Sequence, residues 1–291
     1  MKNKIVTRSL VLIAMFVPGT LSFGVNLGRI MCVGDSLTGG AGQTPYNQFR
    51  EPLNNLLVSN SHTKDFVGPE NGFNFESGLP DNQHAGFGGW GIPRLLTGYS
   101  DDGNTYLGAG KYSEWLTTYD PDVVVFFAGG NDIWRWYGNA QSNGYLNNAP
   151  LRSTVQNWFR DQYQIMLNQT FAFDPSVRLI FGSYAASESN FSVFDRQFKN
   201  EVYADIAVIV QSLVLEQQGL GRNIQYAPIF ELTYNSATPI TYDGTHHNLY
   251  GSGVVGNEIY SQLLNPVPEP SSMILAGVGI LAFLKGRKQK N

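Results

Sequence analysis

RIMCVGDSLTGG, residues 29–40, joins a continuous apolar run to a cluster of glycines and small polar residues. A short apolar run closed by glycine is typical of a parallel strand that is buried on both faces. Ligands of open α/β sheets bind just beyond the carboxyl ends of such strands, and Ser36 follows the run at that place. The alternative is a structural role, because Asp35 and Ser36 are also good caps for a following helix.

Apolar strand-like segments alternate with segments of helical periodicity along the rest of the chain. Strands are predicted at residues 29–33, 65–67, 122–128, 177–181 and 224–227. Helices are predicted at residues 46–59, 111–119, 154–170, 194–218 and 253–264. The alternation predicts an α/β fold in three layers, with a five-stranded parallel sheet and helices on both faces. The expected strand order is 2-1-3-4-5, which places the switch point of the sheet beside Ser36.

The composition fits one globular domain, residues 25–264, with a processing segment at each end. Of the 291 residues, 42% are hydrophobic, which is enough for one large core. The net charge of −4 and the scattered basic residues argue against a nucleic-acid partner. The single cysteine, Cys32, excludes an intrachain disulfide and a Cys-based metal site, so we expect a small buried hydrophobe.

Residues 1–24 have the layout of a secretory signal peptide. Basic residues precede an apolar run at residues 10–17, and small residues follow it. A first core helix is the weaker interpretation, because the run is short and Pro18 would end it. We therefore expect export, with cleavage near residues 22–24.

Residues 265–291 form a second processing segment. The sequence PEP at residues 268–270 precedes an apolar stretch, residues 273–284, and a basic tail. The stretch is short against the roughly 20 residues of a membrane-spanning helix, and the alternative is a terminal core helix. The basic tail favours a segment held transiently in the membrane. This end resembles a PEP-CTERM sorting signal, which implies a Gram-negative host, an exosortase as processing partner, and a product in the cell envelope or outside the cell.

GDSLTGG, residues 34–40, resembles the first block of the GDSL, or SGNH, hydrolase family. The resemblance implies that Ser36 is a nucleophile and that the fold is flavodoxin-like. Three later stretches resemble the family's other blocks in the same order, over more than 200 residues.

GGND, residues 129–132, follows the third predicted strand and resembles the family's third block. Because parallel strands end at one edge of a sheet, Asn131 is expected close to Ser36. The resemblance implies that its amide donates to the oxyanion. The alternative is a turn, for which these residues are good material.

HAGFGGWGI, residues 84–92, is the candidate for the second block. It is similar to a stretch of the family's carbohydrate esterases, and that similarity makes Gly86 the oxyanion glycine, with Gly88 as the alternative. The stretch also contains a glycine pattern of dinucleotide sites, but no predicted strand precedes it and no acidic residue of the expected kind follows it. We expect His84 to be a loop residue that supports the site, and not the base.

YDGTHHN, residues 242–248, precedes the last predicted helix. Two side chains three residues apart can hydrogen-bond, so Asp243 can orient His246 and stabilise its imidazolium. The resemblance to the family's last block implies a triad of Ser36, Asp243 and His246. His247 stands where the family commonly has proline, which leaves it as an alternative base. A metal site here would need a third ligand that the sequence does not offer.

The resemblance as a whole implies a serine esterase that works through an acyl-enzyme and needs no cofactor. Its oxyanion hole would consist of the Ser36 and Gly86 backbone amides and the Asn131 side chain.

The substrate class is suggested by aromatic residues near the third block. Trp134 and Trp136 lie in an insertion at residues 133–151, and Trp90 lies in the second block. Such rings can stack on sugars or pack as a lid, and both interpretations stay open. With the sorting signal they favour removal of acetyl or other acyl groups from carbohydrate. The alternatives are a lipid or short-chain esterase without sugar preference, and a non-catalytic carbohydrate-binding protein of the cell surface.

Overall fold

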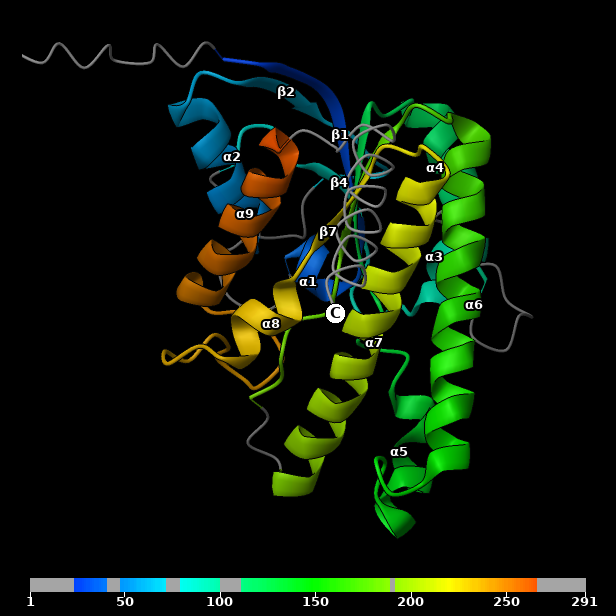
Figure 1. Ribbon diagram of the computed structural model, residues 1–291. Helices are drawn as coiled ribbons and strands as arrows, with labels where there is room; N and C mark the ends of the chain where they lie inside the picture. Colours follow the sequence, from blue (N-terminus) through cyan, green and yellow to red (C-terminus); the bar gives the residue numbers. More distant parts are fainter. Residues whose placement is uncertain (1–23, 41–47, 72–78, 100–110, 189–191, 266–291) are drawn as a thin grey trace, which may run out of the picture.

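The computed structural model describes residues 24–40, 48–71, 79–99, 111–188 and 192–265. These residues form three layers, in which a central sheet lies between two layers of helices (Figure 1). The expected signal peptide, residues 1–24, and the expected sorting segment, residues 265–291, fall outside the described residues except at their inner ends. Within the described part, no helix is long and apolar enough to cross a membrane.

The sheet has seven strands: β1 (Asn26–Gly34), β2 (Thr63–Phe66), β3 (Glu70–Asn71), β4 (Gln83–Gly86), β5 (Val123–Phe127), β6 (Arg178–Gly182) and β7 (Ile224–Ala227). β1 pairs with β5 on one side and with β2 on the other, and β6 and β7 continue the sheet beyond β5. All these pairs are parallel, so the expected order 2-1-3-4-5 is confirmed as β2-β1-β5-β6-β7.

The prediction of five strands, all parallel, is corrected by two additional short strands, β3 and β4. β2 pairs with the beginning of β1, and β4 takes its place beside the end of β1, where Gly34 lies opposite Gly86. β3 pairs with β4 in the antiparallel direction. The four residues of β4 show no clear strand pattern in the sequence, so this strand was not predicted. Their extended conformation depends on pairing with β1.

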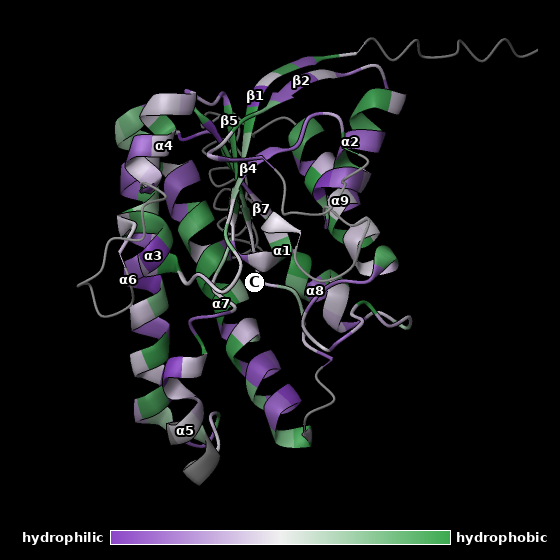
Figure 2. Cartoon of the chain, turned by 180° about the vertical axis from the view of Figure 1, so that it is seen from behind, coloured by the Kyte–Doolittle hydropathy of each residue, from purple (hydrophilic) through white to green (hydrophobic). Residues whose placement is uncertain are grey.

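The helices are α1 (Ser36–Gly39), α2 (Arg50–Ser59), α3 (Ile92–Thr97), α4 (Tyr112–Tyr119), α5 (Trp134–Asn143), α6 (Ala149–Phe173), α7 (Val193–Gly219), α8 (Ile229–Tyr234) and α9 (Leu249–Leu264). Views from both sides show α2 and α9 on one face of the sheet, and α4, α6 and α7 on the other (Figure 1, Figure 2). The prediction of helices on both faces is therefore confirmed.

Helix ends differ from the predicted ones because side-chain caps extend the helices beyond their periodic part. Asn148 caps α6 by accepting a hydrogen bond from the Leu151 N–H at 3.1 Å. Ser192 and Asn248 cap α7 and α9 in the same way. The helices α1, α3, α5 and α8 were not expected, since segments of only 4 to 10 residues show little periodicity.

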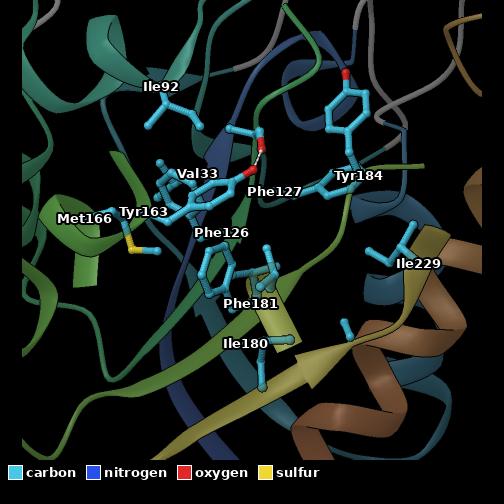
Figure 3. Packing of buried hydrophobic residues seen from close by; sticks show 14 of the residues in the cluster. Val33, Ile92, Phe126, Phe127, Tyr163, Met166, Ile180, Phe181, Tyr184 and Ile229 are labelled. Atoms are coloured by element: carbon cyan, nitrogen blue, oxygen red, sulfur yellow. Dashed lines mark hydrogen bonds between the residues drawn. The ribbon is translucent and has the colours of Figure 1, made fainter. Parts of the chain in front are cut away.

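The core is densest around β5, whose five residues are all buried. The ring of Phe126 packs edge-on against Tyr112 and Phe181, at centroid distances of 6.0 and 5.9 Å. Figure 3 shows Phe126 and Phe181 together with Tyr163. The Tyr163 hydroxyl donates to the Ala128 carbonyl at 2.9 Å. Cys32 is buried as expected, and burial raises the pKa of its thiol to about 12.

Phe126→Ala is expected to lower the free energy of unfolding by about 3–5 kcal/mol, because it leaves a cavity at the centre of the core. Urea denaturation measures this loss. Leu215→Ala on the exposed side of α7 is the control, since Leu215 is 57% exposed, and it should change the free energy by no more than about 0.5 kcal/mol. Equal losses in the two variants would contradict this description of the core.

Candidate active site

Ser36 is the first residue of α1, and only Asp35 separates it from the end of β1. Asp35 caps α1, because its Oδ1 accepts a hydrogen bond from the Leu37 N–H at 3.0 Å. The capping role considered for this stretch is therefore correct for Asp35. This cap leaves Ser36 free for a chemical role, because the Ser36 side chain faces His246.

Ser36, His246 and Asp243 form a continuous series of contacts. His246 Nε2 lies 3.0 Å from Ser36 Oγ, and His246 Nδ1 lies 2.7 Å from Asp243 Oδ2. The Asp243 carboxylate can only accept, so Nδ1 carries the proton and Nε2 is left to accept the Ser36 hydroxyl proton. This arrangement can activate a serine as a nucleophile.

Asp243 is held as an ionised acceptor. Burial alone would raise the pKa of its carboxyl group, but hydrogen bonds from the His246 side chain and from the His246 and Thr245 backbone N–H groups outweigh burial and lower the pKa. A negative charge at this position fixes the imidazole tautomer and favours the imidazolium that forms when the serine reacts.

The loop that carries Asp243 and His246 is braced from the chain after β6. The Ser187 hydroxyl and the Glu188 N–H both donate to the Gly244 carbonyl, at 2.7 and 3.2 Å. The Glu188 carboxylate accepts hydrogen bonds from Ile240 and Thr241 at 2.9 Å each. Ser187 and Glu188 also line a cavity of about 780 Å³ between α7 and α8, whose walls include none of Ser36, Asp243 and His246.

A buried arginine fixes the turn that carries Ser36. Arg50 donates to the carbonyls of Thr38 and Gly39 at the end of α1, at 2.8 and 3.3 Å, and to the Asn82 side chain at 2.8 Å. Burial lowers the pKa of its guanidinium to about 10, which still leaves it charged at neutral pH. The charge faces the carbonyl end of α1, where a cation is favourable.

Asn131 contacts Asp35, the residue before Ser36, and Trp90 of the second block. Asn131 Nδ2 donates to the Trp90 carbonyl at 3.1 Å and to Asp35 Oδ2 at 3.4 Å. The same Asp35 oxygen accepts a hydrogen bond from the Tyr184 hydroxyl at 3.0 Å. Asp35 is fully buried, and burial raises the pKa of its carboxyl group to about 6.

Gly86 does not have the role that the resemblance implied. Its N–H donates to His84 Nδ1 at 2.9 Å, so it is not directed at a bound oxyanion. Glycine is required there for a different reason, because a Cβ at this position would lie 2.4 Å from the Gly39 backbone nitrogen. In the part of the chain that the structure describes, no residue accepts a hydrogen bond from the Gly88 N–H, which leaves Gly88 as the candidate glycine.

His84 and His247 are both buried and neutral. Burial lowers the pKa of His84 to about 2 and that of His247 to about 4. His247 stacks on Phe127 with a centroid distance of 6.5 Å, and neither ring nitrogen has a hydrogen-bond partner among the described residues. The contact with both Asp243 and Ser36 therefore belongs to His246, and His247 is part of the core.

The three candidate sugar-contacting tryptophans lie in different environments. Trp134 is 48% exposed, whereas Trp90 is half-buried and stacks on Phe87 at 4.4 Å. Trp136 is 9% exposed and packs against the Trp158 ring at 5.1 Å. Trp136 is therefore withdrawn as a substrate contact, because α5 turns its side chain into the core.

Sequence reasoning missed Arg50 and Tyr184, which support the site from distant parts of the chain. It also missed Asp132, whose carboxylate accepts a hydrogen bond from the Ile92 N–H at 3.0 Å and joins the second and third blocks. Asp132 had a signal, since it directly follows Asn131. Arg50 and Tyr184 had none, because only the folded chain brings them to the site. No group of three or more His, Cys, Asp or Glu residues within the described segments is arranged to hold a metal ion.

His247→Gln should reduce the loss of stability on acidification. In the folded chain His247 is protonated only near pH 4, whereas in the unfolded chain it is protonated near pH 6.5. Its contribution to the free energy of unfolding is therefore complete above pH 6.5 and is lost as the pH falls toward 4. The loss is on the order of 3 kcal/mol. Urea denaturation of both proteins at pH 7 and pH 4.5 tests this, and parallel losses would contradict it.

The C-terminal segment matches a known sorting signal. Residues 266–289 match the PEP-CTERM protein-sorting motif. The motif implies an exported, cell-surface protein that is processed by an exosortase.

Two curated proteins are similar to part of the chain. A "Multidomain esterase" of Ruminococcus flavefaciens is 30% identical over 131 residues, which cover 43% of this chain and 16% of that protein. A protein named "Putative endoglucanase X", of Acetivibrio thermocellus, is 22% identical over 166 residues, which cover 57% of this chain and 60% of that protein. The chain thus spans less than two thirds of the length of either relative.

The fold is similar to a solved structure over most of its length. A Clostridium thermocellum family 3 carbohydrate esterase is 26% identical, with a TM-score of 0.58, over 81% of this chain and 94% of that one. The largely parallel central sheet agrees with that similarity. This chain therefore has an SGNH esterase-like fold, similar to that of a family 3 carbohydrate esterase, and ends in a PEP-CTERM sorting motif.

Proposed function

We propose that this protein is a serine esterase that removes acetyl or other acyl groups from carbohydrate. The observation that carries the proposal is the series of contacts from Ser36 Oγ through His246 to Asp243, at 3.0 and 2.7 Å. The similarity to carbohydrate esterases supports the same reaction class.

In the proposed first step, Ser36 Oγ attacks the carbonyl carbon of the ester. His246 Nε2 takes the hydroxyl proton, and Asp243 stabilises the imidazolium that results. The tetrahedral intermediate collapses when the bond from the acyl carbon to the sugar oxygen breaks and His246 gives this proton to that oxygen. The product is an acyl group bound to Ser36 and a free alcohol.

We assign the stabilisation of the negative charge on the intermediate to three hydrogen-bond donors: the Asn131 side chain and the backbone N–H groups of Ser36 and Gly88. Asn131 can serve because its contact with Asp35, at 3.4 Å, is close to the limit of a hydrogen bond and can be exchanged for a shorter one. Its bond to the Trp90 carbonyl keeps the amide oriented during the exchange. Gly88 replaces Gly86 in this assignment for the reason given above.

In the second step, water takes the place of the alcohol. His246 removes a proton from the water, whose oxygen attacks the acyl carbon. His246 then gives this proton to Ser36 Oγ as the bond between Oγ and the acyl carbon breaks, and the carboxylic acid leaves. The sequence of steps needs no cofactor, since one histidine serves as base and then as acid.

Carbohydrate is favoured as the acyl carrier by the exposed ring of Trp134. Lys199 contacts both this ring and Thr245, which directly precedes His246, so the ring lies at the side of the candidate triad. A flat exposed aromatic side chain beside a reactive serine suits the apolar face of a sugar. The sorting motif supports a substrate at the cell surface, where polysaccharides are exposed.

The two ends of the chain are assigned to delivery. We propose that residues 1–24 direct export in a Gram-negative bacterium and are removed. Residues 265–291 would then hold the protein in the membrane until an exosortase cleaves near residues 268–270.

Ser36→Ala is expected to abolish hydrolysis of 4-nitrophenyl acetate and of acetylated xylo-oligosaccharides while the melting temperature stays within a few degrees. At most the acceleration of order 10³ to 10⁴ over water that binding and the oxyanion hole provide would remain. Release of acetate, followed by mass spectrometry, measures the activity. A Ser36→Ala variant with wild-type turnover would overturn the proposal.

The same screen separates the alternative functions. Hydrolysis of 4-nitrophenyl butyrate and phospholipids without deacetylation of oligosaccharides would identify an esterase without sugar preference. Binding of polysaccharide with no acid release from any ester would identify a binding protein. Release of reducing ends from unacetylated glucan would identify a glycosidase, for which the site would need two carboxyl groups facing the substrate.

Asn131→Ala is expected to lower kcat by about 10²- to 10³-fold with little change in KM, because the donor acts mainly on the transition state. Steady-state kinetics and the melting temperature are measured on one preparation. Asn131→Asp should be at least as harmful, since a carboxylate would face a developing negative charge. A variant of lowered stability and normal kcat would instead show that Asn131 serves only the turn.

A further inference from the structure

Lys199 is a buried lysine that the proposed chemistry does not use. It lies on α7, far along the chain from Asp243 and His246, and its side chain is only 3% exposed. Lysine is almost never fully buried unless its charge has partners. The partners of Lys199 therefore indicate what it does.

The ammonium of Lys199 connects three parts of the molecule. On its own helix it pairs with Asp195 at 3.5 Å. Toward the candidate triad it donates to Thr245 Oγ1 at 3.4 Å, and on its remaining side it lies 4.9 Å from the centre of the Trp134 ring on α5. Lys199 thus joins α5 and α7 to the residue that directly precedes His246.

The charge of Lys199 acts on the same loop. Burial lowers the pKa of its ammonium, whereas the carboxylates of Asp195 and Asp243 favour the charged form. Since attraction between two charges is mutual, the ammonium also favours the ionised form of Asp243. A lysine with a purely structural role would have a sufficient partner in Asp195. The additional contact of Lys199 with Thr245 therefore points to a role at the triad loop.

We propose that Lys199 is a positioning residue that holds the loop of Asp243 and His246 and makes the triad active at lower pH. Its hydrogen bond to Thr245 fixes the loop, and its positive charge favours the ionised form of Asp243, which the triad requires. This inference rests on the proposed function, in which His246 accepts the Ser36 proton.

The charged and titratable groups around the triad loop come from several elements. Asp195 on α7 faces Lys199 directly. Asp35, which directly precedes Ser36, interacts electrostatically with His246. Tyr242 stacks on His246 at 6.0 Å, and His247 is kept neutral by burial. Near neutral pH Lys199 carries a positive charge that Asp195, Asp35, Tyr242 and His247 do not. Replacing it by a neutral residue therefore removes positive charge from the surroundings of the triad loop, and the direction of the electrostatic effect is defined.

Lys199→Met is expected to lower kcat about tenfold and to move the acid limb of the kcat/KM profile upward by about 0.5 pH unit. Lys199→Arg, which keeps the charge, should leave the acid limb in place. Both are measured on 4-nitrophenyl acetate between pH 4 and 9, with the melting temperature of each variant recorded. An unchanged limb in Lys199→Met, or a limb that moves downward because the contact of Asp243 with His246 is lost, would overturn the electrostatic role.

Two further variants separate charge, hydrogen bond and stability. Thr245→Val removes the hydrogen-bond acceptor and keeps the charge, so it should lower kcat and leave the acid limb unchanged. Lys64→Met is the matched control, because Lys64 is also buried, pairs with Asp81 at 2.7 Å and lies over Phe66 at 4.4 Å. It is expected to lower the melting temperature without changing kcat or the pH profile. A shift of the acid limb in Lys64→Met would show that loss of any buried lysine produces the effect.

A fluorophosphonate probe keeps the inference separate from the proposed function. The probe reacts with an activated serine without any ester substrate, and mass spectrometry locates it on Ser36. If the probe labels Ser36 of the wild type, and the pH dependence of labelling is shifted in Lys199→Met, the positioning role of Lys199 would be supported even if no ester were hydrolysed. Ester hydrolysis by the wild type with identical profiles in Lys199→Met would retain the esterase and reject the role of Lys199.

Discussion

The buried carboxylate of Asp35 is the point on which the candidate site depends. It accepts hydrogen bonds from Leu37, Tyr184 and Asn131, and so joins the chain at the ends of β1, β6 and β5. Burial raises its pKa to about 6, so the ionised form present at neutral pH destabilises the fold by about 3 kcal/mol relative to a protonated one. A buried charge of this kind persists only where every neighbour is arranged to donate to it.

The second half of the site is held by contacts of a different kind. The loop with Asp243 and His246 has no regular secondary structure, and its position is set by Glu188 and Ser187 on one side and by Lys199 on another. A rigid strand end thus presents the serine, while a loop with several independent supports presents the base. Correct geometry between the two requires both sets of contacts, because a displacement of about 1 Å is enough to reduce catalysis.

The sequence was a good guide wherever one residue type serves one local purpose. The strand before Ser36, the order of the five main strands, the neighbourhood of Ser36 and Asn131, and the hydrogen-bonded pair of Asp243 and His246 were all predicted. The errors have a common cause. Gly86 was expected to donate to an oxyanion and Trp136 to contact substrate, but the direction of an N–H or a side chain depends on neighbours that a linear pattern does not specify.

The sequence by itself determined the parallel α/β layout and the chemistry of the strand ends, because hydrophobic periodicity and glycine-bounded turns are local properties. Only the tertiary structure decided which histidine faces Ser36, which glycine lies against α1, and which tryptophan is exposed. It also decided that Arg50, Tyr184 and Lys199 surround the site. These depend on contacts between residues from 11 positions apart, as for Arg50 and Gly39, to 210 positions apart, as for His246 and Ser36. Such contacts form only when the whole core packs, and no local pattern encodes them.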